Sequence, residues 1–443
     1  MPRRSHSLRA WKTRRSPTEG ASLVCRCAAL VLTVASAHAQ EQRPNGFYLT
    51  SPLSLSAGYD QGFLVGSRAA NDSVTLLTAP TFEWMRSTHR TDFSVNYQPE
   101  FELFSRDPDL DAWNHLSAMR YRYRINARWG VDAGNLFLST MDSSRSLVNS
   151  LLLLPRGRFL QNSSYAGLSY RANELTKVSF RFDNALTLTD LPGVLAGRLD
   201  GVTTAGTVTV DRTLTSHHKL SGSYSFLHSH PLTPEVSGSP TNVHLVNAGY
   251  TYEINPALIV RLAGGAVKSN STSFIGAADV EKRLGGLWMA AGYQRYLSFF
   301  GGLASLSNAP PSATSFADGL TPNSIYQVFS VRAWGQLSKR LGVEGSAQRA
   351  INAADPRLPS VRSVIGQLHL SYKLTDRVSA FIRLEHYGQS ANSLLGVPLE
   401  RNRFFGGLEI ALSRPPEPDN VRNHHRQAPQ DSEELKDQHP EEK

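Results

Sequence analysis

The sequence is poor in cysteine and in long apolar runs. Its two cysteines, Cys25 and Cys27, lie close to the N-terminus, and no other residues complete a metal-binding motif with them. We therefore predict no disulfide framework, no metal site and no bound cofactor. Beyond residue 40, no stretch approaches the ~18 consecutive apolar residues of a transmembrane helix. This excludes a helical membrane protein.

Net charge is also modest once the two ends of the chain are set aside. The formal net charge is +9, of which residues 1–40 contribute +6 and residues 414–443 contribute −3, so residues 41–413 carry +6. No basic run is interleaved with aromatic residues in the way typical of nucleic-acid-binding segments. We therefore predict no nucleic-acid partner.

The two ends of the chain have compositions unlike the rest. Residues 1–26 are rich in arginine, an apolar stretch covers residues 28–35, and Ala37-His38-Ala39 forms a small-residue cleavage site. This order of segments predicts a signal peptide over residues 1–39. Residues 414–443 contain almost no apolar side chains, which predicts a disordered tail because such a segment cannot bury enough surface to fold.

What the chain does have is period-two alternation. Within residues 372–387, two alternating runs meet at a polar turn formed by residues 374–377. Alternation places successive side chains on opposite faces, so the stretch is predicted to be a β-hairpin. Each run is long enough to cross a bilayer as a tilted strand, which needs about 9–11 residues.

The same unit recurs along most of the chain. It is sharpest over residues 119–129, where apolar or aromatic residues alternate with arginines and one asparagine. Counting such runs predicts about 18 strands, in the range 16–20, and the joints between them are alternately short and long. Bacterial outer-membrane barrels have an even strand number, short periplasmic turns and longer outer loops. We therefore predict an all-β fold, a closed antiparallel transmembrane β-barrel over residues 40–413, with the tail in the periplasm.

A membrane location gives each face of this sheet a definite environment. In lipid every backbone donor and acceptor must be paired, so the sheet must close on itself, with apolar side chains facing the outer-membrane lipid. Aromatic side chains near strand ends are expected to form belts at the two membrane interfaces. The candidates for these belts are Tyr59, Trp84, Tyr97, Trp129, Tyr170, Tyr250, Tyr252, Tyr372 and Tyr387.

The opposite face is charged, and we expect it to line the lumen. The candidate lumen-lining charge ladder consists of Arg120, Arg122, Arg124, Arg128, Arg171, Arg181, Arg332, Arg383, Glu100 and Glu102. Two interpretations stay open. In the first, the arginines of residues 120–128 lie beside Glu100 and Glu102 of the preceding strand, and the charges brace a large wall. In the second, they form a basic ladder that guides anions or acidic sugars through a pore by its field.

About 18 tilted strands enclose more space than side chains can fill, which favours a channel. We expect passage of hydrophilic solutes, among them anionic solutes or a secreted polysaccharide. The alternative is a structural or surface-interaction barrel whose lumen is closed by loops, for which residues 151–155 and 299–322 are the candidates. No nucleophile motif accompanies the serines and histidines, so we predict that the protein is not an enzyme. The sequence does not fix the oligomeric state.

Three short joints share an aromatic-x-apolar-polar pattern: Tyr123-Arg-Ile-Asn, Tyr252-Glu-Ile-Asn and Tyr372-Lys-Leu-Thr. With the overall organisation, they resemble the outer-membrane β-barrel porin superfamily, and in particular the barrels associated with exopolysaccharide export. The resemblance covers roughly residues 47–413. It implies a bacterial outer-membrane location, reached through the signal peptide and the barrel-assembly machinery, and an arginine-rich lumen. It carries over no residue-by-residue motif.

Overall fold

The computed structural model describes residues 45–65, 68–142, 156–190, 200–232, 240–269, 271–297, 325–353, 362–390 and 398–412. These residues form one antiparallel sheet of twenty strand segments and a short 3₁₀ helix, η1 (Pro108–Leu110). Within the described ranges, no helix has the length and hydropathy needed to span a membrane. The predicted signal peptide, the tail and the loops 151–155 and 299–322 lie outside the described residues.

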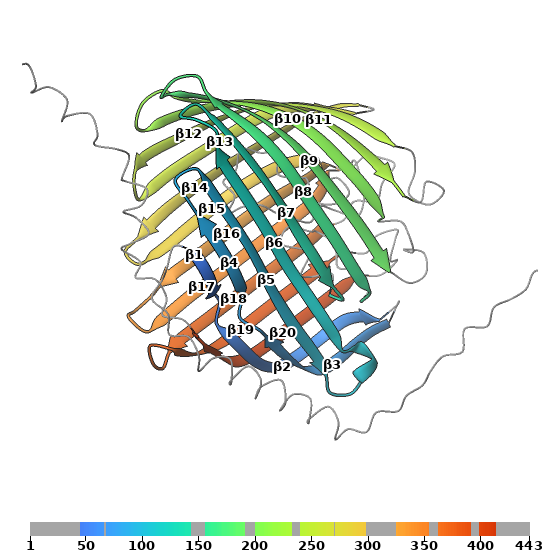
Figure 1. The fold of residues 1–443 in the computed structure, drawn as a ribbon. Coiled ribbons are helices and arrows are strands. Elements are labelled where there is room, and N and C mark those ends of the chain that lie inside the picture. The colour runs from blue at the N-terminus through green and yellow to red at the C-terminus, as the bar shows by residue number, and fades with distance from the viewer. Residues whose placement is uncertain are drawn as a thin grey trace, which may run out of the picture. The chain divides into compact units, whose positions relative to one another are not determined.

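Twenty strand segments are numbered in chain order, and those from β5 to β20 pair consecutively around the sheet (Figure 1). The first ten are β1 (Asn45–Leu49), β2 (Leu53–Val65), β3 (Arg68–Thr78), β4 (Phe82–Ser87), β5 (Thr91–Phe104), β6 (Ala112–Arg124), β7 (Trp129–Thr140), β8 (Arg158–Arg171), β9 (Thr176–Asp190) and β10 (Gly201–Thr213). The others are β11 (His218–Pro231), β12 (Thr241–Asn255), β13 (Leu258–Lys268), β14 (Thr272–Leu284), β15 (Leu287–Leu297), β16 (Ile325–Gln336), β17 (Leu341–Ala353), β18 (Arg362–Lys373), β19 (Val378–Gln389) and β20 (Leu399–Ile410).

The twenty segments build eighteen barrel strands because two strands are interrupted. Segment β5 pairs with both β3 and β4, while β2 pairs with β3 and β1 pairs with β4. Segments β1 and β2 therefore form one barrel strand, interrupted at residues 50–52. Segments β3 and β4 form the next, interrupted at residues 79–81. Each break contains a proline, Pro52 or Pro80, which lacks the N–H that a ladder needs. Residues 68–87 are accordingly two segments, β3 and β4.

Pairing of β2 with β20 closes the barrel. The two strands are in antiparallel register from Leu53 opposite Ile410 to Gln61 opposite Asn402. Figure 1 shows blue β2 lying beside red β20, so the two ends of the sheet meet. The predicted closed antiparallel barrel of 18 strands is confirmed.

The joints are mostly short at one end of the barrel and longer at the other, as predicted. The β2–β3 joint is a short exception at the longer end, since β2 ends at Val65 and β3 begins at Arg68. Asn71 explains how strand pairing starts so early, since its Oδ1 accepts a hydrogen bond from the Gly62 N–H (2.9 Å), where β2 carries a bulge. The Asn71 side chain thus links β2 and β3 at the bulge, close to the short joint between them.

The two faces of the sheet differ as the alternation predicts. Apolar side chains that point outward are widely exposed, among them Phe180, Phe182, Val208, Val210, Val331, Ile382 and Phe404. Outward aromatic residues gather near the short turns, where the rings of Trp129 and Tyr170 lie 4.6 Å apart between centroids. Tyr387 does not join such a belt. It has the strand parity of Arg383 and is buried on the inner side, where its hydroxyl accepts a hydrogen bond from Gln367 (3.2 Å).

Candidate functional site in the barrel lumen

The three arginines of β6 that the sequence singles out share one face and are exposed. Arg120 and Arg122 lie opposite Ser94 and Asp92 of β5, close to the short-turn end, and Arg124 ends the strand. Arg122 is also in register with Asp132 of β7, so it lies between two acidic positions. Charged residues on this part of the wall therefore alternate in sign from strand to strand.

The expected proximity of these arginines to Glu100 and Glu102 is wrong. In the β5–β6 register, Glu100 lies opposite Asn114 and Glu102 opposite Ala112, at the far end of the strands from Arg122. Glu100 instead accepts hydrogen bonds from Thr78 Oγ1 (3.0 Å) and Asn114 Nδ2 (3.4 Å). The joint at residues 105–111 fixes this register, so sequence neighbours on the two polar faces are not spatial neighbours.

The remaining predicted arginines divide between two walls. Arg128 lies in the β6–β7 turn and Arg171 ends β8; the Arg171 N–H donates to the Arg128 carbonyl (2.8 Å). On β9, Arg181 pairs with Asp183 (2.7 Å), and its guanidinium lies 4.0 Å from the Tyr165 ring centroid. These residues and the β6 arginines occupy β6–β9, whereas Arg332 lies on β16 and Arg383 on β19. No single ladder joins all of them.

The strongest electrostatic feature of the lumen is a buried network around two arginines that the ladder omits, Arg401 and Arg403 of β20. Arg401 binds both oxygens of Asp60, at 2.9 and 2.5 Å, and both oxygens of Asp142, at 2.9 and 3.1 Å. Arg403 contacts the same two carboxylates at 3.2 Å. All four side chains are at most 5% exposed.

The network continues through Glu102, Arg156 and Glu385. Arg403 also pairs with Glu102 (3.2 Å) and Glu385 (3.3 Å). Arg156 Nη2 donates to Glu102 (2.7 Å) and to the Leu110 carbonyl (2.7 Å). Glu102 is fully buried, and its cationic partners, Arg156 and Arg403, lie outside β6.

This network holds both ends of the β7–β8 joint against a distant wall. Asp142 follows β7 and Arg156 precedes β8, yet they bind side chains of β20 and β5. Four barrel strands lie between β7 and β20, so five inter-strand spacings of ~4.8 Å, about 24 Å of wall, separate the two strands. The network therefore joins positions that are far apart around the barrel.

Three guanidiniums and four carboxylates make up the network, so its formal charge is −1. Moving each ion out of water costs several kcal/mol, and the pairs recover this only through their close geometry. The network is therefore a structural brace and provides no excess of positive charge for an anion.

A titratable group beside this network lies in the β5–β6 joint. Burial raises the pKa of the Asp111 carboxyl above its ordinary value, although the Phe104 N–H donates a hydrogen bond to it (2.8 Å). Asp111 thus keeps its proton to a higher pH than an exposed aspartate. As the pH falls, Asp111 is protonated before an exposed aspartate would be, and the negative charge beside Arg156 and Glu102 decreases.

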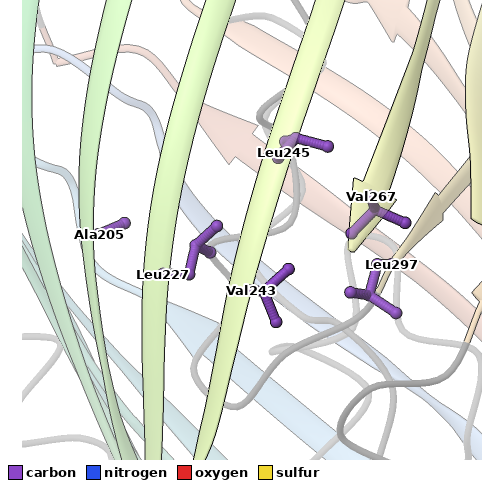
Figure 2. Packing of buried hydrophobic residues seen from close by; sticks show 6 residues of the cluster. All are labelled: Ala205, Leu227, Val243, Leu245, Val267 and Leu297. Atoms are coloured by element: carbon purple, nitrogen blue, oxygen red, sulfur yellow. The ribbon is translucent and has the colours of Figure 1, made fainter. Parts of the chain in front are cut away.

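The wall opposite the network is apolar at the same end of the barrel. Its buried side chains are Ala205, Leu227, Val243, Leu245, Val267 and Leu297. They come from β10, β11, β12, β13 and the end of β15, and Figure 2 shows them following one another across these strands. In the pairing order β12 lies nine strands from β2 in either direction. The lumen thus has a charged wall facing an apolar one.

The sequence contains one signal for the network. Arg401 and Arg403 are two apart, as inward residues of one strand must be, and both lie in β20. Asp142 and Arg156 lie outside any strand, so alternation says nothing of them. Among the described residues, no three His, Cys, Asp or Glu side chains are grouped as metal ligands.

No protein-family model matches the chain, and no curated protein matches it. Among solved structures it is similar to OccAB4 of Acinetobacter baumannii, with 9% identity and a TM-score of 0.44 over 83% of this chain and 98% of that one. It is also similar to Pseudomonas aeruginosa OpdO (15% identity, TM-score 0.44, 81% and 96% covered) and OprD (12%, 0.42, 82% and 96%). Because these TM-scores are below 0.5, the fold assignment rests on the strand pairing.

Proposed function

We propose that the protein is a bacterial outer-membrane channel through which hydrophilic solutes pass. The supporting observation is a closed sheet of 18 strands whose outward face is apolar and whose inward face carries exposed charges. A barrel of this strand number is wider than its own inward side chains. Anionic solutes or a secreted acidic polysaccharide are the finer part of the proposal, supported by the exposed arginines on β6.

The direct test is conductance of the purified, folded full-length protein in planar lipid bilayers. A channel gives discrete current steps that scale with the conductivity of the bathing salt. A folded protein that inserts and gives no steps contradicts the proposal. Folding is checked beforehand by the shift in electrophoretic mobility between unheated and boiled samples.

A structural or surface-interaction barrel with a closed lumen is the second candidate. It is favoured by the ion-pair network, because both ends of the β7–β8 joint are fixed inside the barrel by Asp142 and Arg156. The same bilayer experiment separates the two functions. Conductance in wild type supports the channel, whereas conductance that appears only after Arg401→Ala supports the closed barrel.

A further inference from the structure

Two tryptophans near the short-turn end belong to neither the predicted ladder nor the ion-pair network. Trp288 is the second residue of β15, and Trp334, near the end of β16, is its partner in register. Trp288 is also in register with Arg283 of β14, on the same face as the Asp279 and Glu281 carboxylates that bind Arg261. Both indoles therefore face the lumen, and both are partly exposed.

The two indole rings lie close together and nearly parallel. Their ring centroids are 6.3 Å apart and their planes lie within 11° of parallel. The other tryptophans of the described ranges, Trp84, Trp113 and Trp129, pair with outward-facing residues of neighbouring strands. An indole pair exposed to the aqueous side of the wall is unlike these lipid-facing rings, since lipid cannot cover it.

A guanidinium lies over each of the two indole rings. The Arg332 guanidinium carbon lies 4.4 Å from the Trp334 ring centroid, and that of Arg283 lies 5.8 Å from the Trp288 ring centroid. Among the described residues neither guanidinium has a carboxylate partner, in contrast to Arg261, which binds Asp279 at 2.7 Å and Glu281 at 3.2 Å. Both cations thus keep donor groups for a ligand anion.

An acceptor completes the row. Glu344 of β17 is exposed and in register with Trp334, so one row across the sheet reads Arg283, Trp288, Trp334 and Glu344. A ligand that fits this row needs a flat apolar face for the rings and an anionic group for the arginines. It also needs hydroxyl donors for the glutamate. An aromatic carboxylate lacks the hydroxyls and meets only repulsion from Glu344.

We propose that Trp288 and Trp334, with Arg283, Arg332 and Glu344, form a binding subsite for an acidic sugar ring at the short-turn end of the lumen. The ring's C–H face packs on the indoles, its carboxylate binds the guanidiniums, and its hydroxyls donate to Glu344. The subsite deepens the proposed channel function and rests on it for its transport role.

The test measures binding directly, with the folded full-length protein in detergent, a trisaccharide of uronic acid and an uncharged trisaccharide of the same length. Saturation-transfer NMR and titration give the affinities. We expect the uronate to bind wild type and Trp129→Leu equally. We expect it to bind the double variant Trp288→Leu/Trp334→Leu at least about tenfold more weakly, a factor equivalent to ~1.4 kcal/mol. Arg332→Gln should weaken uronate binding and leave the uncharged sugar unaffected.

Equal uronate affinities in wild type and the double variant would overturn the subsite, as would equal affinities of wild type for the charged and uncharged sugars. Because the NMR measurement of binding does not depend on conductance, the subsite proposal and the channel proposal can be contradicted independently. Absence of current with intact uronate binding contradicts only the channel. Current without uronate binding contradicts only the subsite.

Discussion

At the scale of single residues, Arg403 is the centre of the buried charge network. Four carboxylates surround it, those of Asp60, Glu102, Asp142 and Glu385, and its guanidinium carbon lies 5.1 Å from the Phe405 ring centroid. Removing this cation leaves several buried anions without their partner. The cost of such a change is larger than the value of the pairs themselves, because the anions remain desolvated.

We expect Arg403→Met to lower the free energy of unfolding by about 3–5 kcal/mol, the range for breaking a buried ion pair. Urea unfolding in lipid vesicles, followed by tryptophan fluorescence, measures the change. Arg120→Met is the matched control, since Arg120 is exposed on the inner face, and it should leave the midpoint nearly unchanged. A similar loss in both variants would show that the network is not the cause.

The exposed arginines determine ion preference if the anionic part of the proposal is correct. We expect wild type to prefer anions in a salt gradient and Arg122→Glu to move the reversal potential toward cation preference, because the substitution reverses a charge exposed to the pore. Arg122→Lys keeps the charge and should retain the wild-type value. A reversal potential that Arg122→Glu does not alter would contradict a guiding role for this residue.

At the scale of elements, the two interrupted strands are held by side chains where the ladder fails. Ser51 Oγ accepts hydrogen bonds from the Thr81 N–H (2.7 Å), Thr81 Oγ1 (3.0 Å) and Gln98 Nε2 (3.1 Å). The Thr50 N–H donates to the Thr81 carbonyl (3.0 Å). One serine hydroxyl therefore takes over the acceptor role of a strand carbonyl between the two breaks.

We expect Ser51→Ala to destabilise this region by about 1–3 kcal/mol, since it leaves the Thr81 N–H without its acceptor. Hydrogen–deuterium exchange should become faster in β1 and β4 and stay unchanged in β11 and β12. Ser54→Ala, on the adjacent strand, should have no such effect. Uniformly faster exchange over the whole sheet would indicate a global loss instead.

Alternation alone predicted strands at residues 119–124 and on both sides of the turn at residues 374–377, because a period of two is a local property of the chain. It did not mark where the strand ends, since residues 125–128 continue the alternation but form the β6–β7 turn. Register is not local. It placed Glu102 beside Arg403, 301 residues away, and moved Arg122 away from Glu102. The whole ion-pair network could not be predicted, since two of its seven members, Asp142 and Arg156, lie outside strands and the others come from four different strands.

At the scale of the whole molecule, closure depends on close contact between the first and last strands. A Cβ at Gly58 would lie 1.9 Å from the Phe404 carbonyl oxygen and 2.5 Å from a ring carbon of Phe405. The Phe404 carbonyl belongs to the β2–β20 pairing, so moving it would disrupt the hydrogen bonds that close the barrel. Only glycine fits at this position of β2.

We expect Gly58→Val to prevent closure, so that the protein no longer shows the heat-dependent change in electrophoretic mobility of a folded barrel. Gly222→Ala is the control, because a Cβ there meets nothing within 4 Å, and it should fold normally. If Gly58→Val folds with wild-type yield, the prediction is wrong, and the β2–β20 pairing can accommodate a side chain at this position.

The row that begins at the two tryptophans has one more consequence. It continues from Glu344 to His369 of β18 and Arg383 of β19. Its members rise from the second residue beyond the short turn in β15 to the sixth in β19, because hydrogen-bonded neighbours lie perpendicular to tilted strands. The row is therefore part of a helical path along the wall. In the proposed channel, a solute that follows this path turns about the barrel axis as it advances, which a short flexible chain does more easily than a stiff one.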